Sequence, residues 1–358
     1  MNEARGASAA GVGTTFTALP DLASRALGGS VVWANDEFFA DKENLINPAE
    51  PVFSPGTFTA KGQQYDGWET RRRRPGAPGV AGNDHDSAIV RLGAPGLIRG
   101  VIVDTAHFLG NYPPRCSVEA TWCDGYPSPE RLLETAQWTE IVHSYPLSGG
   151  HAHHFAVNSR GRRFSHVRLN LLPDGGVARL RVHGEPLPDP VFLDGVTVNL
   201  AALSDGARVS ACSDMYFGSA DNMLMPGLAR TMGEGWENAR RRDDGNDWAE
   251  IRLVGEGIVR VLEIDTTHYK GNAPYEAMVS AARVGEDRQP AQEDWSVLLP
   301  KTELQPDTAH RFLIRDAGPA THLRLDIYPD GGISRLRALG ALTPAALGQL
   351  RSRWEQSR

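Results

Sequence analysis

The chain contains one block of thirteen residues in two versions. Residues 101–113 read VIVDTAHFLGNYP and residues 262–274 read LEIDTTHYKGNAP, with six of the thirteen positions identical. The identical positions hold Asp, Thr, His, Gly, Asn and Pro, and they follow a run of mostly β-branched and apolar residues. This order predicts a strand that leaves a hydrophobic core and ends in a loop of hydrogen-bonding side chains. The two loops are therefore the first candidates for functional sites.

Other blocks recur in the same order along the chain. The matched pairs are 36–46 with 214–224, 67–74 with 235–242, 86–92 with 247–253 and 165–181 with 321–337. The last pair is identical at ten of seventeen positions, and the offset between the copies falls from 178 to 156 along the chain. The second copy is therefore shorter between blocks, where loops tolerate deletion. Solenoid repeats are much shorter, roughly 20–50 residues, so this repeat indicates a duplicated domain.

The duplication divides the chain. We predict the two copies of one domain at residues 19–185 and 196–342. Residues 1–18 are rich in Gly, Ala and Ser and predict a mobile tail. A linker rich in Pro and Asp is expected over 186–195, and a C-terminal helix or tail over 343–358.

The closing block indicates the fold class. His166, Arg168 and Asn170 alternate with apolar residues, which is the period of a strand with one buried face. Residues 173–176 read PDGG, a turn signal, and the alternation resumes after it, so the block predicts a β-hairpin. Helical periodicity is confined mainly to residues 128–139 and 343–358. Many short strands with Gly and Pro between them predict two antiparallel β-sandwich domains.

Composition excludes several classes of protein. The chain has 358 residues, 41% hydrophobic and 23% charged, with a net charge of −7, which disfavours wholesale disorder and nucleic acid as a partner. No apolar run approaches the ~20 residues that span a bilayer, and the first residues lack the apolar segment of a secretory signal. Three cysteines are too few for a disulfide framework. We expect a cytoplasmic protein with no membrane partner.

The repeated Asp-Thr-x-His loops supply candidate catalytic residues. A histidine could transfer protons while an aspartate three residues before it fixes its tautomer, which would require the strand to bend. The alternative is a structural histidine that ties the strand end to a loop, because the same hydrogen-bond geometry serves both roles. The candidates are Asp104 with His107 and Asp265 with His268.

The repeated Gly-Trp-Glu-x-x-Arg motif (Gly67–Arg72 and Gly235–Arg240) holds a carboxylate and arginines beside a tryptophan. A guanidinium fork suits a carboxylate ligand, and Glu69 adds a candidate catalytic carboxylate. The alternative is a core tryptophan beside a solvated arginine strip. Asp36 and Glu37 lie on a turn signal and could place carboxylates at the mouth of a site; Met215 replaces the glutamate in the second copy, which slightly favours the first copy as the catalytic one.

Nothing in the sequence specifies a cofactor. His107, Asp104 and Glu37 are acceptable metal ligands, but no HxH, HExxH or CxxC spacing supports a metal site. The histidines at 151, 153 and 154 have no counterpart in the second copy. No phosphate-binding or dinucleotide motif is present. We therefore predict no metal and no cofactor, while a divalent ion stays compatible with the residue types.

The ordered set of duplicated motifs resembles the allantoicase family from about Leu19 to Gly340. The resemblance implies two jelly-roll β-sandwiches of the galactose-binding-like type. It also implies hydrolysis of allantoate to ureidoglycolate and urea during purine breakdown, with allantoate as the small-molecule partner and a homo-oligomer as an open option. One departure is Ser87, where the second copy has Trp248. The rival hypotheses are a tandem carbohydrate-binding module and a silent paralogue of the enzyme.

That reaction assigns roles to the candidates. Urea leaves poorly unless its nitrogen is protonated, so an acid is needed, and a base must accept a proton from water. Arginines should bind the substrate carboxylate, and asparagines should bind ureido N–H and C=O groups. The expected substrate-binding residues are Arg72, Arg73, Asn111, Arg240, Arg241 and Asn272. The expected catalytic residues are Asp36, Glu37, Glu69, Asp104, His107, Asp265 and His268.

Overall fold

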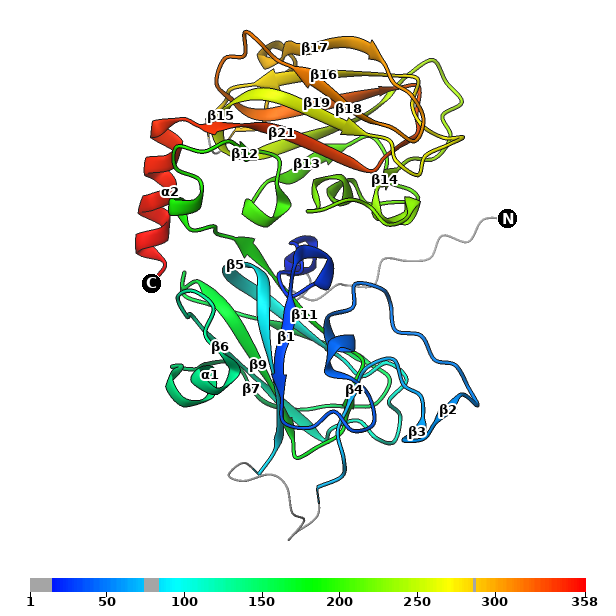
Figure 1. Cartoon of the computed structure of the whole chain (residues 1–358), viewed down its shortest axis with the longest axis vertical. Helices are drawn as coiled ribbons and strands as arrows, with labels where there is room; N and C mark the ends of the chain where they lie inside the picture. Colours follow the sequence, from blue (N-terminus) through cyan, green and yellow to red (C-terminus); the bar gives the residue numbers. More distant parts are fainter. Residues whose placement is uncertain (1–14, 74–83, 286–287) are drawn as a thin grey trace, which may run out of the picture. The chain divides into compact units, whose positions relative to one another are not determined.

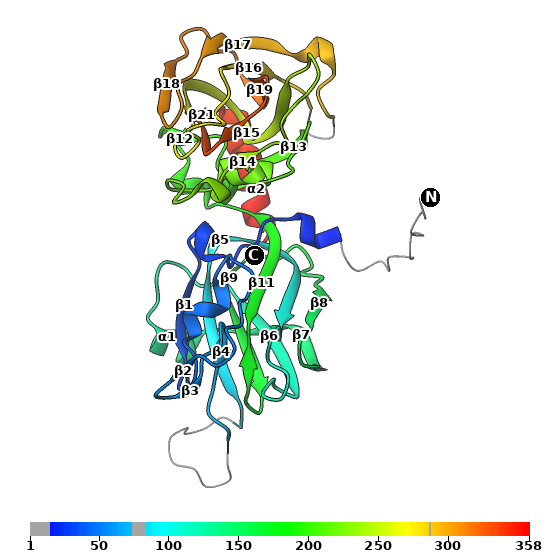
Figure 2. The same ribbon diagram turned by 90° about the vertical axis from the view of Figure 1, so that its right-hand side faces the viewer.

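The computed structural model describes residues 15–73, 84–285 and 288–358. The chain separates into two compact units, Met1–Pro186 and Leu187–Arg358 (Figure 1). Each unit is a β-sandwich, and its two layers can be followed in Figure 2.

In the first unit a single long strand belongs to both layers. Strand β5 (Asp86–Asp104) pairs through its first half with β1 (Ser30–Ala34) and β9 (Phe164–Leu172). Its register shifts between Arg91 and Gly96, and its second half pairs with β8 (Ala152–Ala156) and β11 (Arg179–Pro186). Strands β6 (Arg115–Thr121) and β7 (Thr139–Pro146) extend the first layer in the order β1-β5-β9-β6-β7. The bend after Arg91 therefore fixes where the two layers meet.

The predicted hairpin in the closing block is wrong. Strand β9 pairs with β5 and β6, and β11 pairs with β5, so the two strands on either side of the PDGG turn do not pair with each other. The turn instead carries the chain from one layer to the other. Just after it, β10 (Gly176–Val177) pairs with the short strand β4 (Trp68–Glu69). Turn chemistry alone does not distinguish a hairpin from a crossover between layers.

The second unit repeats this architecture around β15 (Asp247–Asp265), which pairs with strands of both layers. Its other strands are β12 (Val198–Asn199), β13 (Arg208–Cys212), β14 (Trp236–Glu237), β16 (Glu276–Ala282), β17 (Ser296–Glu303), β18 (Ala309–Leu313), β19 (Ala320–Tyr328), β20 (Gly332–Ile333) and β21 (Arg335–Leu342). As in the first unit, the two-residue strands β14 and β20 pair with each other. The first unit also contains the hairpin of β2 (Phe58–Thr59) and β3 (Gly62–Gln63).

Two α-helices form within the segments predicted to be helical. Helix α1 (Pro129–Thr135) begins after Ser128 and α2 (Pro344–Gln356) after Thr343, and each of these residues caps its helix by accepting a backbone N–H. Short 3₁₀ turns connect the strands: Thr15–Ala18, Arg25–Leu27, Lys42–Ile46, Pro190–Phe192, Leu203–Asp205, Ala220–Leu224, Met232–Glu234 and Gln292–Asp294. The first of them lies in the predicted tail, yet Phe16 is buried there; the rest of that tail lies outside the described residues.

The strands of the closing block are buried on both faces. Val167, Leu169 and Leu171 form the core side as predicted, but His166 and Asn170 on the opposite side are also buried. Arg168 of that side lies over the ring of Trp138 at 4.5 Å. In the second unit Arg324 lies over Trp248 at 4.3 Å, so the departure at Ser87 is compensated by a tryptophan from another part of the chain.

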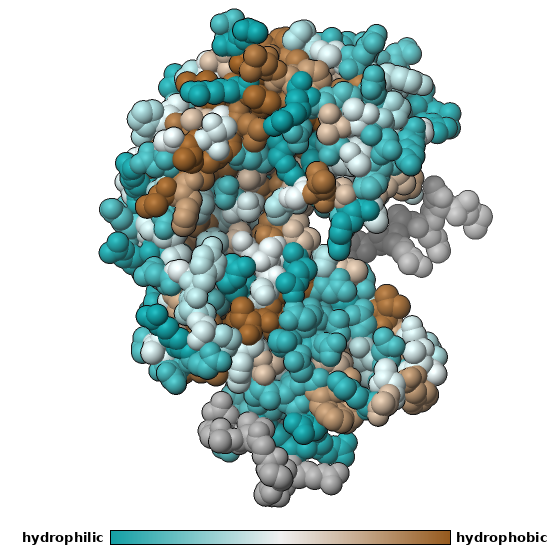
Figure 3. Space-filling model, viewed as in Figure 1, coloured by the Kyte–Doolittle hydropathy of each residue, from teal (hydrophilic) through white to brown (hydrophobic). Residues whose placement is uncertain are grey.

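The surface is otherwise largely polar. In Figure 3 apolar residues gather in patches over the second unit, among mostly hydrophilic neighbours. The exposed large apolar residues of the second unit include Val297 and Leu313. Among the described residues, no helix is long and apolar enough to cross a membrane.

Candidate active site

The short strand of the Gly-Trp-Glu motif is fixed by its tryptophan. Trp68 is fully buried, and its indole Nε1–H donates to the carbonyl oxygen of Asp36 at 2.7 Å. Trp236 donates in the same way to Asp214 at 2.8 Å. Gly67 is required before the tryptophan, since a Cβ there would lie 2.7 Å from both the Phe108 ring and a backbone oxygen. The core tryptophan expected as the alternative explanation thus positions the carboxylate that follows it.

That carboxylate meets the asparagine of the thirteen-residue block. Asn111 Nδ2 donates to Glu69 Oε1 at 2.8 Å, and Asn272 Nδ2 donates to Glu237 Oε1 at 2.6 Å. Burial raises the pKa of the Glu69 carboxyl above its usual value, and the hydrogen bond from Asn111 offsets part of that increase. The fold therefore brings together one carboxylate and one amide in each unit. Glu237 was not among the predicted residues, although its motif is repeated in the sequence.

The predicted contact between Asp104 and His107 is not among the hydrogen bonds of the described residues. Asp104 Oδ1 accepts the backbone N–H of Ala106 at 2.8 Å, which turns the chain at the strand end. His107 is exposed, has a φ of 69°, and its Nε2 lies 3.1 Å from the carbonyl oxygen of Pro51. The histidine therefore points toward a loop rather than back to the aspartate.

The second unit repeats this arrangement. Asp265 accepts the N–H of Thr267 at 2.8 Å, and His268, with a φ of 76°, places Nε2 2.9 Å from the carbonyl oxygen of Ala229. The bend that would bring each aspartate to its histidine does not form, because the carboxylate is used to close the turn. A catalytic role for either histidine stays a prediction.

The predicted arginines separate into two groups. Arg73 donates from Nε to Asp86 at 2.8 Å, and Arg241 donates from Nη2 to Asp247 at 3.0 Å; both aspartates are buried. These arginines therefore neutralise buried carboxylates at the start of β5 and β15. Their neighbours Arg72 and Arg240 are exposed, and neither has a hydrogen-bond or ion-pair partner in the part of the chain that the structure describes. Arg72 and Arg240 are the better candidates for a substrate carboxylate.

Asp36 and Glu37 are both occupied in the first unit. Asp36 Oδ2 accepts Arg71 Nε at 2.7 Å, and Glu37 accepts the backbone N–H of Lys42 at 3.1 Å and its Nζ at 3.3 Å. The proposed site mouth at Glu37 is thus an ion pair with Lys42. The preference for the first copy as the catalytic one stays a prediction.

Two buried arginines were missed in the sequence. Arg179 donates to the carbonyl oxygens of Ala49 and Asp66 at 3.0 Å and to Asp66 Oδ2 at 2.7 Å. Its counterpart Arg335 donates to the carbonyl oxygen of Glu234 at 2.7 Å, and burial lowers its pKa. Each arginine holds the loop that precedes the Gly-Trp-Glu motif. The sequence could have identified both arginines, because they belong to the repeated Arg-Leu-Arg sequence of the closing block.

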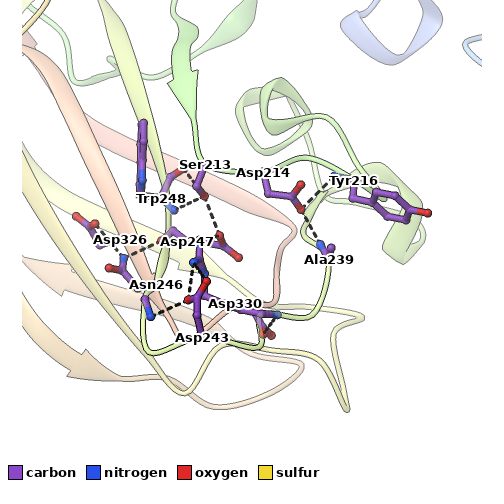
Figure 4. A network of polar contacts seen from close by, with 12 residues as sticks. Ser213, Asp214, Tyr216, Ala239, Asp243, Asn246, Asp247, Trp248, Asp326 and Asp330 are labelled. Carbon is purple, nitrogen blue, oxygen red and sulfur yellow. Dashed lines mark hydrogen bonds and ion pairs between the residues drawn. The ribbon is translucent and has the colours of Figure 1, made fainter. Parts of the chain in front are cut away.

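Groups of at least three His, Cys, Asp or Glu side chains that could hold a metal ion are absent from residues 15–73, 84–285 and 288–358. The acidic residues of the second unit shown in Figure 4 are linked by hydrogen bonds instead; Asp247, for example, accepts Ser213 Oγ at 2.9 Å. In the 151–154 cluster, His153 Nδ1 lies 3.1 Å from the carbonyl oxygen of Val103. Asp247 and His153 thus each have a partner within their own unit.

Comparison with known proteins relates this geometry to a family. The family model for the allantoicase repeat matches residues 20–187 and 198–343. The chain belongs to the allantoicase family. A probable allantoicase of Nocardia farcinica is 52% identical over 329 residues, covering 91% of this chain and 95% of that protein. A probable allantoicase of Streptomyces coelicolor is 48% identical over 346 residues, covering 95% and 90%.

Solved structures agree with this family. The allantoicase crystal structure from Saccharomyces cerevisiae superposes with a TM-score of 0.73 at 33% identity, covering 90% of this chain and 93% of that one. The family and the two-sandwich fold predicted from the sequence are confirmed.

Proposed function

We propose that this chain hydrolyses allantoate to ureidoglycolate and urea. The observation that carries the proposal is the duplicated carboxylate–amide pair, Glu69 with Asn111 and Glu237 with Asn272, in a chain of the allantoicase family. The reaction adds water to the carbon that bears the substrate carboxylate and two ureido groups, and it breaks one carbon–nitrogen bond. A carboxyl group that gives and then regains a proton suits both halves of that exchange.

In the proposed mechanism the protonated glutamate donates its proton to the nitrogen of the departing ureido group. The electron pair of the carbon–nitrogen bond goes to that nitrogen, and urea leaves. Water then bonds to the same carbon and returns a proton to the carboxylate. A raised pKa, as burial gives Glu69, favours the protonated form that this first step needs.

Neighbouring side chains would bind the rest of the substrate. The amides of Asn111 and Asn272 hold one oxygen of each glutamate, which leaves the other oxygen to face the substrate. Arg72 or Arg240 would bind the substrate carboxylate with a guanidinium fork. Each follows its glutamate by three residues in the sequence.

The test measures urea released from allantoate by purified, chelator-treated chain. We expect turnover in the parent, and a loss of roughly 100- to 10,000-fold when the glutamate of the active unit is replaced, in Glu69→Gln or in Glu237→Gln, because proton-transfer groups contribute about that much. Glu43→Gln is the control: it removes a half-exposed carboxylate that pairs with Arg25. No urea from folded parent protein would refute the proposal. Activity that returns only with a divalent ion would change the expected cofactor.

Two finer proposals accompany the function. A cytoplasmic location fits the three free cysteines, of which Cys116 is buried with a pKa raised to about 12. A homo-oligomer stays a prediction, and sedimentation of the purified chain would test it.

A further inference from the structure

The duplication places an arginine in the first unit where the second has an alanine. Arg71 and Ala239 occupy equivalent positions, two residues after the glutamates of the repeated motif. The surrounding backbone is the same, because Arg71 N and Ala239 N each donate to Oδ2 of an aspartate, Asp36 or Asp214. Arg71 is therefore a long side chain that the second unit lacks, on a backbone that both units share.

In the first unit that side chain fills a position formed by the Asp36 carboxylate and the Phe38 ring, which we call the seat. Arg71 Nε donates to Asp36 Oδ2 at 2.7 Å, and its guanidinium lies over the ring of Phe38 at 5.5 Å. The Asp36 side chain is only 6% exposed beneath it. A planar group with N–H donors thus occupies this seat within the chain itself.

In the second unit the seat is present without its arginine. Asp214 Oδ2 accepts the backbone N–H groups of Ala239 at 2.6 Å and Tyr216 at 3.3 Å (Figure 4), and Oδ1 has no partner among the residues that the structure describes. Tyr216 replaces Phe38 and meets Phe217 at 85°, as Phe38 meets Phe39 at 89°. Its exposed fraction is 73%, against 44% for Phe38, whose ring lies under Arg71 at 5.5 Å and Lys61 at 5.8 Å.

We propose that Asp214 and Tyr216 bind a ureido group of the substrate in the place that Arg71 takes in the first unit. A ureido group is planar and carries N–H donors on both nitrogens, so it can present a fork to a carboxylate much as a guanidinium does. Its flat face can lie on the tyrosine ring. The choice of a ureido group over a guanidinium compound rests on the proposed function.

The position also suits the chemistry. Ala239 follows Glu237 by two residues, so the space that its short side chain leaves open is near the Glu237 carboxylate along the chain. The backbone oxygen of Glu237 accepts the N–H groups of Phe217 and Gly218 at 3.1 Å, which ties the aromatic loop to that strand. The geometry therefore assigns substrate binding to the second unit, while Arg71 closes the equivalent seat of the first.

The test is a binding measurement on the full chain that needs no turnover. Equilibrium dialysis with saturating N-carbamoylglycine, which carries one ureido group and one carboxylate, should give one molecule bound per chain. Asp214→Asn should weaken binding by roughly 10- to 100-fold, the worth of a charge-assisted hydrogen bond. Ala239→Arg should abolish binding by supplying the missing guanidinium. Arg71→Ala should open the seat of the first unit and raise the bound N-carbamoylglycine to two molecules per chain.

Two further probes define the ligand. N-acetylglycine, which lacks the terminal NH₂, should bind at least 10-fold more weakly than N-carbamoylglycine. If guanidinoacetate binds more tightly than N-carbamoylglycine, the seat is a guanidinium site and the ureido assignment is overturned. Unchanged affinity in folded Asp214→Asn and Ala239→Arg would overturn the seat itself. Normal urea release by Ala239→Arg would do the same and leave the proposed function standing. Binding at Asp214 without urea release by the parent would refute the function alone.

Discussion

Asn111 donates a hydrogen bond to Glu69 across 42 positions of the sequence, at 2.8 Å. The same bond forms between Asn272 and Glu237 in the second unit at 2.6 Å. The backbone oxygen of each asparagine accepts an N–H from the glycine pair of the PDGG turn, Gly176 in the first unit and Gly332 in the second. Three separate repeated motifs therefore converge on one carboxylate, which is why we place the proton transfer there.

Removing that amide should shift the pH dependence of turnover. In Asn111→Ala the ionised Glu69 loses a donor, so the pKa of its carboxyl rises further; Asn272→Ala removes the matching donor from Glu237. An acid catalyst loses activity as pH rises through its pKa, and the alkaline limb of the pH–rate profile should therefore move to higher pH in the variant of the active unit. Turnover should fall roughly 10-fold through lost positioning. A profile that keeps its shape in both variants would place the acid elsewhere.

The glycine of the Gly-Trp-Glu motif should be intolerant of a methyl group. In Gly67→Ala the new Cβ would meet the ring of Phe108 and the backbone of Val177 and Ala178 at less than 3.0 Å. Overpacking of this kind costs about 1–3 kcal/mol of unfolding free energy. Gly110→Ala is the matched control, since no atom lies within 4 Å of its Cβ. Urea denaturation of both variants should show a lower midpoint for Gly67→Ala only.

The sequence predicted these motifs better than it predicted their partners. Repetition revealed Glu69, Asn111 and the loop histidines, because identical polar residues in two copies stand out against diverged apolar ones. It could not show that Asp104 bonds to its own turn, since that depends on which N–H the carboxylate meets once the strand ends.

The crossover at the PDGG turn was misassigned for a related reason. Alternation identifies a strand but not the strand it pairs with, and β9 and β11 pair with different halves of β5. The Arg71–Asp36 pair is likewise a tertiary contact, at which the two copies differ by a single residue.

Two buried histidines should make the protein sensitive to acid. Burial lowers the pKa of both His166 and His322 to about 4, with nearby Arg91 and Arg252 acting in the same direction. The unfolded chain binds these protons near pH 6.5, so stability is present above that pH and falls as the pH drops from 6.5 toward 4. Each histidine contributes up to about 3 kcal/mol of that loss.

The measurement is the unfolding free energy at several pH values for parent and His322→Gln. The variant should show a shallower loss between pH 6.5 and 4, whatever its stability at neutral pH. Burial raises the pKa of Asp205 to about 6, which acts in the opposite direction, but that contribution is common to both proteins and cancels in the comparison. His143→Gln, at an exposed position, serves as the control. Parallel curves for parent and His322→Gln would contradict the prediction.

Replacing the two loop histidines separates their candidate roles. His107 and His268 each place Nε2 about 3 Å from a loop carbonyl oxygen, 3.1 Å from Pro51 and 2.9 Å from Ala229. An imidazole whose Nε2–H is donated to a carbonyl is held as a tether, so His107→Ala and His268→Ala should lower stability by roughly 0.5–1.5 kcal/mol. Turnover per folded molecule should stay within a few-fold of the parent, because proton transfer is assigned to the glutamates. A loss of roughly 100- to 10,000-fold at unchanged stability in either variant would instead make that histidine the proton-transfer group, and would identify its unit as the catalytic one.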